Sequence, residues 1–104
     1  MPNYAFTYYG EPRFERPDDG AAYMGKWQAW MGGLGDAMVN PGIPIGPSRI
    51  VSSSGVSDDS AANRVTGFSV VTAASLDAAV EMARTCPHLE HGTIGVGEAM
   101  DMGM

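Results

Sequence analysis

The chain has 104 residues, of which 44% are hydrophobic and 17% are charged. A chain of this length is expected to form one domain, and a chain this apolar can bury enough surface to fold. Its formal net charge is −6, and a surface of this sign repels the phosphates of nucleic acids. We therefore expect a single globular domain, residues 1–104, that does not bind nucleic acid.

The N-terminal segment predicts neither export nor membrane insertion. Its sequence, MPNYAFTYYG, lacks the positive charge and the apolar run of a signal peptide, and no stretch of the chain is long enough to span a bilayer. The single cysteine, Cys86, cannot form an internal disulfide, which suits a reducing compartment. We expect a cytoplasmic protein that makes no membrane contact.

The first part of the chain predicts a strand and then a helix. Aromatic residues recur with a period of two over residues 4–9, as is typical of a strand. Asp18 or Asp19 is expected to cap a helix over about 21–38. Apolar residues recur there at three and four positions and so share one helical face: Tyr23, Met24, Trp27, Trp30, Met31 and Leu34.

The middle of the chain is rich in turn residues. Three prolines in residues 40–47 predict an extended segment at a sheet edge or in a loop, because proline donates no backbone hydrogen bond. A short strand is expected over 49–53, followed by a hairpin loop without periodicity over 54–64. A further strand is expected over 66–73.

The last part of the chain predicts a second helix and a last strand. Ser75 is expected to cap the helix, and Pro87 to stop it at Cys86. One face of this helix holds Leu76, Ala79, Val80 and Ala83. Apolar residues alternate over about 93–102, so the order of elements is βαββαβ.

This order predicts an α+β fold with an antiparallel sheet and both helices on one sheet face. One face would hold Tyr4, Phe6, Tyr8, Phe68, Val70, Ile94 and Val96, and the other Ala5, Tyr9, Val71, Ala73 and Ala99. Which face the helices cover is left open by the sequence. Because both faces are apolar, we expect a homodimer that pairs through the uncovered side of the sheet.

Two segments, GFSVVTAASLDAAVEMARTCPHL over 67–89 and GTIGVGEAM over 92–100, resemble the YCII-related family. The shared features are a glycine and an aromatic residue on a strand, an alanine-rich helix that ends in Cys-Pro, and a last strand led by glycine. The resemblance implies a ferredoxin-like subunit and a dimeric α/β barrel, similar in architecture to muconolactone isomerases and cofactor-free monooxygenases. Some members carry a proposed catalytic histidine on the first helix, where this chain has Trp27.

Aromatic residues on the first strand and the first helix are candidates for lining a ligand pocket between that helix and the sheet. They are Tyr8, Tyr23, Trp27 and Trp30. Small-molecule sites favour apolar and aromatic walls with a few polar groups. The same stripe could equally be plain hydrophobic core.

The segment CPHLEH, residues 86–91, is the densest cluster of reactive side chains. Such residues can bind zinc, but structural zinc sites draw ligands from two segments and no second cluster exists, so we expect no metal and no cofactor. As a general base, His91 is the first candidate and His88 the second, with Asp36 as a carboxylate that could orient the ring. The alternative for these residues is a structural role.

The sequence thus favours a protein that resembles the YCII-related family and binds or processes a small molecule in a cavity between the first helix and the sheet. One alternative is a non-catalytic dimeric module that acts through a protein partner. Another is a cofactor-free isomerase or an enzyme similar to a monooxygenase. Whether the protein is an enzyme stays open.

Overall fold

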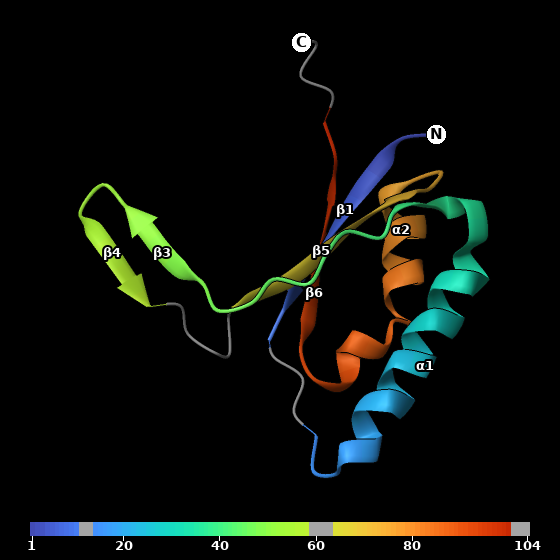
Figure 1. Ribbon diagram of the computed structural model, residues 1–104. Helices are drawn as coiled ribbons and strands as arrows, with labels where there is room; N and C mark the ends of the chain where they lie inside the picture. The colour runs from blue at the N-terminus through green and yellow to red at the C-terminus, as the bar shows by residue number, and fades with distance from the viewer. Residues whose placement is uncertain (11–13, 59–63, 101–104) are drawn as a thin grey trace.

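The computed structural model describes residues 1–10, 14–58 and 64–100. It is an α+β fold in which two helices cover one face of an antiparallel sheet, and a separate hairpin projects to one side (Figure 1). The strands of the main sheet lie in the order β2 (Met38–Asn40), β5 (Val65–Thr72), β1 (Asn3–Tyr9) and β6 (Thr93–Glu98). The helices are α1 (Pro17–Leu34) and α2 (Leu76–Ala83), and the hairpin joins β3 (Arg49–Ser52) to β4 (Gly55–Asp58).

The first helix begins and ends earlier than the expected 21–38. It begins at Pro17 because a proline at the first helical position already has a helical φ, and the carboxylate of Asp19 accepts a hydrogen bond from the backbone amide of Arg16. It ends at Leu34 because Gly35 adopts a φ of +56°, which breaks the helix. A 3₁₀ turn, η1 (Gly35–Ala37), follows.

The expectation for the second strand is wrong in part. Residues 49–52 form a strand, but it belongs to the separate hairpin, and Val51 pairs there with Val56 inside the segment expected to be a loop. The main sheet instead takes β2 as its edge and adds a bridge between Pro44 and Gly67, so the proline-rich segment lies at an edge as expected. Residues 59–63 of the expected loop lie outside the described part of the chain.

The second helix has the expected N-cap, since the hydroxyl of Ser75 accepts a hydrogen bond from the amide of Ala78. It ends at Ala83 rather than at Cys86, and a 3₁₀ turn, η2 (Pro87–Glu90), follows it. The last strand ends at Glu98, so residues 99 and 100 of the expected 93–102 strand do not belong to it, and residues 101 and 102 lie outside the described part of the chain. None of the helices in the described ranges is long and apolar enough to cross a membrane.

The helices cover the face of the sheet that holds Tyr4, Phe6 and Tyr8. The expected grouping of the strand 66–73 is wrong, because Tyr4 pairs with Val71 and so Val71, rather than Val70 or Phe68, shares the covered face. Alternation within one strand does not reveal how that strand aligns with its neighbour, and a shift by one residue exchanges the faces. Ala5, Val70 and Phe68 therefore lie on the open face.

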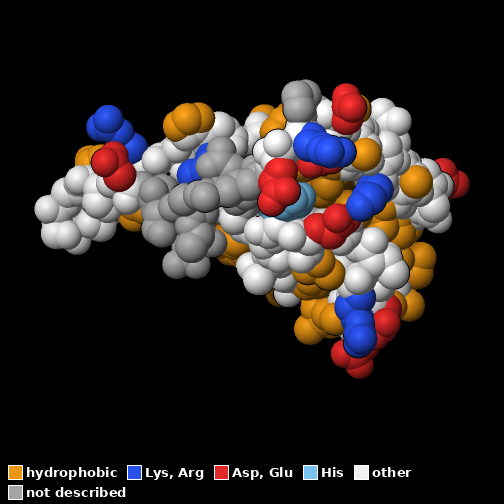
Figure 2. All heavy atoms as spheres, turned by 90° about the horizontal axis from the view of Figure 1, so that it is seen from below, with side chains coloured by type: hydrophobic (Ala, Val, Ile, Leu, Met, Phe, Trp, Pro, Cys, Tyr) orange, Lys and Arg blue, Asp and Glu red, His pale blue; other side chains and the backbone are white. Residues whose placement is uncertain are grey.

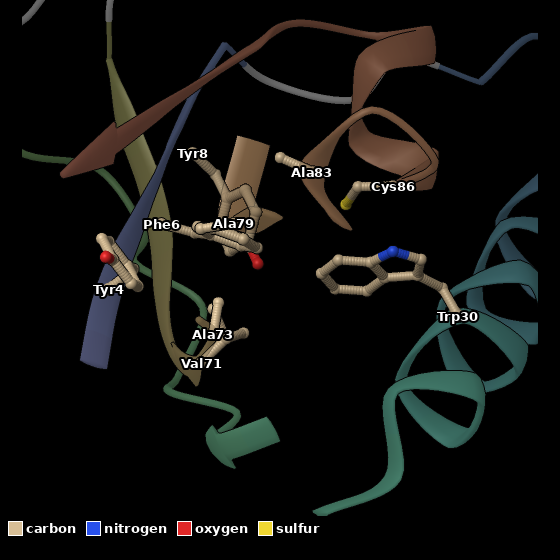
Figure 3. Close-up of a cluster of buried hydrophobic side chains, with 9 residues drawn as sticks. All are labelled: Tyr4, Phe6, Tyr8, Trp30, Val71, Ala73, Ala79, Ala83 and Cys86. Atoms are coloured by element: carbon tan, nitrogen blue, oxygen red, sulfur yellow. The ribbon is translucent and has the colours of Figure 1, made fainter. Parts of the chain in front are cut away.

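The core is small and is tied together by Trp30. Its indole reaches from α1 to stack on Phe6 of β1, with ring centroids 6.3 Å apart (Figure 3). The indole N–H also donates a hydrogen bond of 3.1 Å to the carbonyl of Met82 on α2. One side chain thus joins the sheet and both helices.

Gly42, at the sheet edge, is a position where the fold requires glycine. Its φ is +72°, and a Cβ there would overlap the carbonyl oxygen of Phe68. We expect Gly42→Ala to lower the free energy of unfolding by about 2–4 kcal/mol, because the backbone must move or stay strained. Gly32→Ala is the matched control: it lies in α1 with open space around it and should raise stability by up to about 1 kcal/mol. Urea unfolding measures both, and equal effects would contradict the close approach at Gly42.

Candidate functional site: an apolar cavity beside α1

A cavity lies between α1 and the edge of the main sheet. Its volume is about 390 Å³, within the range of roughly 300–1,000 Å³ that small-molecule sites occupy. The side chains and backbone that line it are those of Tyr8, Tyr23, Met24, Trp27, Met31, Pro41, Gly42, Ile43, Pro44, Thr66, Gly67, Phe68, Ser69 and His88. The position agrees with the expected one, between the first helix and the sheet.

The outer rim of the cavity is the segment Pro41–Pro44, and hydrogen bonds hold it against β5. The Ser69 hydroxyl donates to the carbonyl of Pro41 at 3.0 Å, and the amide of Ile45 donates to the carbonyl of Thr66 at 2.9 Å. The amide of Gly42 donates to the side-chain carbonyl of Asn40, which closes a local turn. The rim is therefore built on the edge strand instead of hanging as a free loop.

The inner wall is a set of aromatic rings in edge-to-face contact. Trp27 meets Tyr8 with ring centroids 5.2 Å apart and meets Tyr23 at 6.2 Å. The Tyr8 hydroxyl donates to Ser69 at 2.8 Å. The buried hydroxyl of Tyr23 makes no hydrogen bond of ordinary geometry among the described residues. The wall therefore offers ring surface together with one buried donor that lacks a partner.

His88 is 2% exposed and lines the same cavity. Its Nε2 lies 2.7 Å from the carbonyl of Tyr9, and because a carbonyl only accepts, Nε2 carries the proton and Nδ1 is left as an acceptor. Burial lowers the pKa of His88, and the bond to Tyr9 opposes this shift. Gly92 permits the contact, since a Cβ there would lie 2.8 Å from Nε2. The ring is thus held neutral beside the cavity.

The other titratable groups in or next to the cavity are neutral as well. Burial raises the pKa of Tyr8 and of Tyr23, so both phenols keep their protons. Burial also raises the pKa of the Cys86 thiol to about 11, which makes it a poor nucleophile at neutral pH. No fixed charge lines the cavity among the residues that the structure describes. The site is therefore suited to apolar contact and neutral hydrogen bonding.

Of the four residues expected to line a pocket, three do so. Tyr8, Tyr23 and Trp27 face the cavity, whereas Trp30 lies in the core against Phe6. Trp27 and Trp30 share one helical stripe, but they lie about one turn apart along α1, and Trp27 is the one that lines the cavity. Sequence reasoning did not assign the rim to the site, although the three prolines in residues 40–47 predicted an extended segment at a sheet edge or in a loop.

The three catalytic candidates do not come together. His91 lies in a separate hollow of about 340 Å³, with ring centroids 4.9 Å from Tyr23 and 5.2 Å from Phe14. An ion pair of 3.0 Å between Lys26 and Glu90 borders this hollow. Seen from the side on which α1 begins, a histidine lies among acidic and basic side chains (Figure 2).

Asp36 lies beyond the opposite end of α1 from His91. Tyr23, which contacts His91, is about 16 Å along the helix axis from Leu34, where α1 ends. Asp36 is exposed in η1, and no hydrogen bond joins its described side chain to either histidine. The pairing of Asp36 with a histidine therefore has no support in the geometry, and His88 is the candidate that touches the cavity.

Within residues 1–10, 14–58 and 64–100, no group of three or more histidine, cysteine, aspartate or glutamate side chains is placed to hold a metal ion.

A comparison of the chain with protein-family models found no match, and a comparison with curated proteins found none. The cavity itself offers ring surfaces, two flexible methionines, and the polar groups of Thr66, Ser69 and His88.

The buried, neutral state of His88 makes stability depend on pH. Its pKa is lower in the folded chain than in the unfolded chain, so below about pH 6.5 the unfolded chain binds more protons. The stability that the folded chain gains from the neutral imidazole of His88 is present in full above that pH. It is lost as the pH falls towards the pKa of His88 in the folded state. We expect the free energy of unfolding to decrease from pH 7.5 to 5.5 in the wild type, and less steeply in His88→Gln.

His91→Gln is the control for this measurement, because it removes the other histidine and leaves His88 in place. It should alter the wild-type pH dependence less than His88→Gln does when urea unfolding is repeated at each pH. If His88→Gln kept the full slope, the buried imidazole would not be its origin.

Proposed function

We propose that this protein binds an uncharged, largely apolar ring compound in the cavity between α1 and the segment Pro41–Pro44. The observation that carries this proposal is the cavity itself, which combines a volume of about 390 Å³ with aromatic walls and no fixed charge among the described residues. A charged ligand would lose hydration there without gaining an opposite charge. The net charge of −6 adds repulsion against anions.

The contacts suggest how such a ring is held. Trp27 and Tyr8 offer rigid surfaces at low cost in conformational entropy, and Met24 can adjust its shape to the ligand. The imidazole of His88 and the hydroxyl of Tyr23 are neutral polar groups on residues that line the cavity, and they can supply hydrogen bonds to a ligand. A ring with a single hydroxyl or amide group suits this set.

We further propose that the chain is a YCII-related protein with a ferredoxin-like subunit that forms a homodimer through its sheet. The sheet order β2-β5-β1-β6 with both helices on one face supports the ferredoxin-like subunit. The open face, with Ala5, Val70 and Phe68, supports self-association through this side of the sheet. The free, buried thiol of Cys86 supports a cytoplasmic location.

The binding proposal is tested with three naphthalene probes that share one ring system: 2-naphthol, 2-naphthoate and 2-naphthylmethylamine. We expect 2-naphthol to bind with a Kd of roughly 10–300 µM by isothermal titration calorimetry, as its size allows. The anion and the cation should bind at least about tenfold more weakly, because their charges lose hydration without a partner. Tightest binding of the cation would contradict the uncharged ligand and leave the cavity in place.

Variants identify the site of binding. Trp27→Ala should weaken 2-naphthol binding at least about tenfold, since it removes the largest ring of the wall. Leu76→Ala is the matched control, because it removes an exposed apolar side chain on α2 that does not line the cavity. It should bind as the wild type does. Equal affinity of all three proteins would overturn the cavity as the site.

A further inference from the structure

The β3–β4 hairpin, Arg49–Asp58, stands apart from the rest of the molecule. All of its strand residues are exposed, and it forms a sheet of its own. It extends away from the helices in the ribbon view and again in the view from below (Figures 1 and 2). An isolated two-stranded hairpin is at best marginally stable in water, so a hairpin of this kind needs a surface to pack against.

One side of the hairpin is suited to such packing. Val51 pairs with Val56, so both side chains point to the same side, and they are 75% and 61% exposed. The pair Arg49 and Asp58 flanks them and brings its opposite charges within 3.8 Å. This side of the hairpin therefore presents two valines beside an ion pair. Because the ion pair has no net charge, a negatively charged surface does not repel it.

The chain exposes more surface than a compact domain of its mass. Its accessible surface is 6957 Å², whereas a monomer of its mass is expected to expose about 5,600 Å². Its radius of gyration is 15.0 Å, against about 13 Å for a compact domain of this length. The excess surface is more than the roughly 800 Å² that each partner buries in a standard interface.

The open face of the main sheet has a row of mostly small residues that suits packing by Val51 and Val56. Val70 pairs with Ala5, and Ala5 pairs with Gly97, so these three residues form one row across the open face. The row lacks large side chains at two of its three positions, and a Cβ at Gly97 would meet nothing within 4 Å. Glycine at such a place lets another backbone approach closely.

We propose that the hairpin of each subunit packs Val51 and Val56 onto the row Val70, Ala5 and Gly97 of a second copy, and that this exchange of arms holds the homodimer together. The inference rests on the homodimer proposed above. A second copy suits the surface because a two-fold axis covers both arms and both rows with one arrangement.

Two pairs of variants test the exchange. Val56→Asp places a charge on the packed side of the arm, and Ser57→Asp places the same charge one residue away on its other side. Gly97→Phe fills the row, and Gly33→Phe adds the same ring at an open position on α1. We expect Val56→Asp and Gly97→Phe to raise the Kd of the dimer at least about tenfold and the two controls to change it less than about threefold, by sedimentation equilibrium.

Mixing the two disruptive variants provides a sharper readout. In a mixed dimer, the arm of the Gly97→Phe subunit is intact and meets the intact row of the Val56→Asp subunit. One of the two contacts is thereby restored, so the mixed dimer should be tighter than either variant with itself. Circular dichroism and urea unfolding, measured on each variant, show whether the subunit is still folded.

The outcomes separate the two proposals. A wild type that sediments as a monomer at about 10 µM would overturn both the homodimer and the exchange of arms. A wild-type dimer whose Kd is unchanged by Val56→Asp and Gly97→Phe would overturn the exchange alone. A mixture no tighter than the separate variants would also overturn it.

Discussion

The placement of Trp30 is the contact on which the rest of the structure depends. Helix α1 contains four glycines, two of them directly before its last residue, and among its described residues Trp30 is the one in the buried core cluster, with Trp27, Met31 and Leu34 packed against that cluster. The stack on Phe6 and the hydrogen bond to Met82 bring β1, α1 and α2 together. With α1 held there, its preceding turns and the edge segment Pro41–Pro44 border the cavity.

Burial determines the charge of the titratable groups in and next to that cavity. The same loss of hydration raises the pKa of the two phenols and of the Cys86 thiol and lowers the pKa of His88, so each of these groups is neutral near pH 7. Groups that carry charge, such as Lys26 and Glu90, lie outside the cavity around the second hollow. The cavity therefore combines apolar contact with neutral polar groups, which suits the uncharged ligand proposed above.

The two sides of the sheet differ in what they can support. The covered side bears the core and the cavity, and it is complete within one subunit. The open side bears a row of small residues, and the strand residues of the separate hairpin are all exposed. The proposed ligand site and the proposed contact between subunits thus lie mainly on opposite sides of the sheet, and Phe68 is shared between the open face and the cavity lining.

The sequence by itself determined the α+β class, both helices and the three main strands, because the periods of 2 and 3.6 depend only on neighbours along the chain. It also named Tyr8, Tyr23 and Trp27, since Tyr23 and Trp27 share one helical face and Tyr8 belongs to the aromatic first strand. Only the tertiary structure decided that Val71 joins Tyr4 on the covered face, that residues 49–58 leave the main sheet, and that His88 rather than His91 meets the cavity. Each of these depends on how segments far apart in the chain align, and strand register and helix docking are set by packing across the fold, not by local pattern.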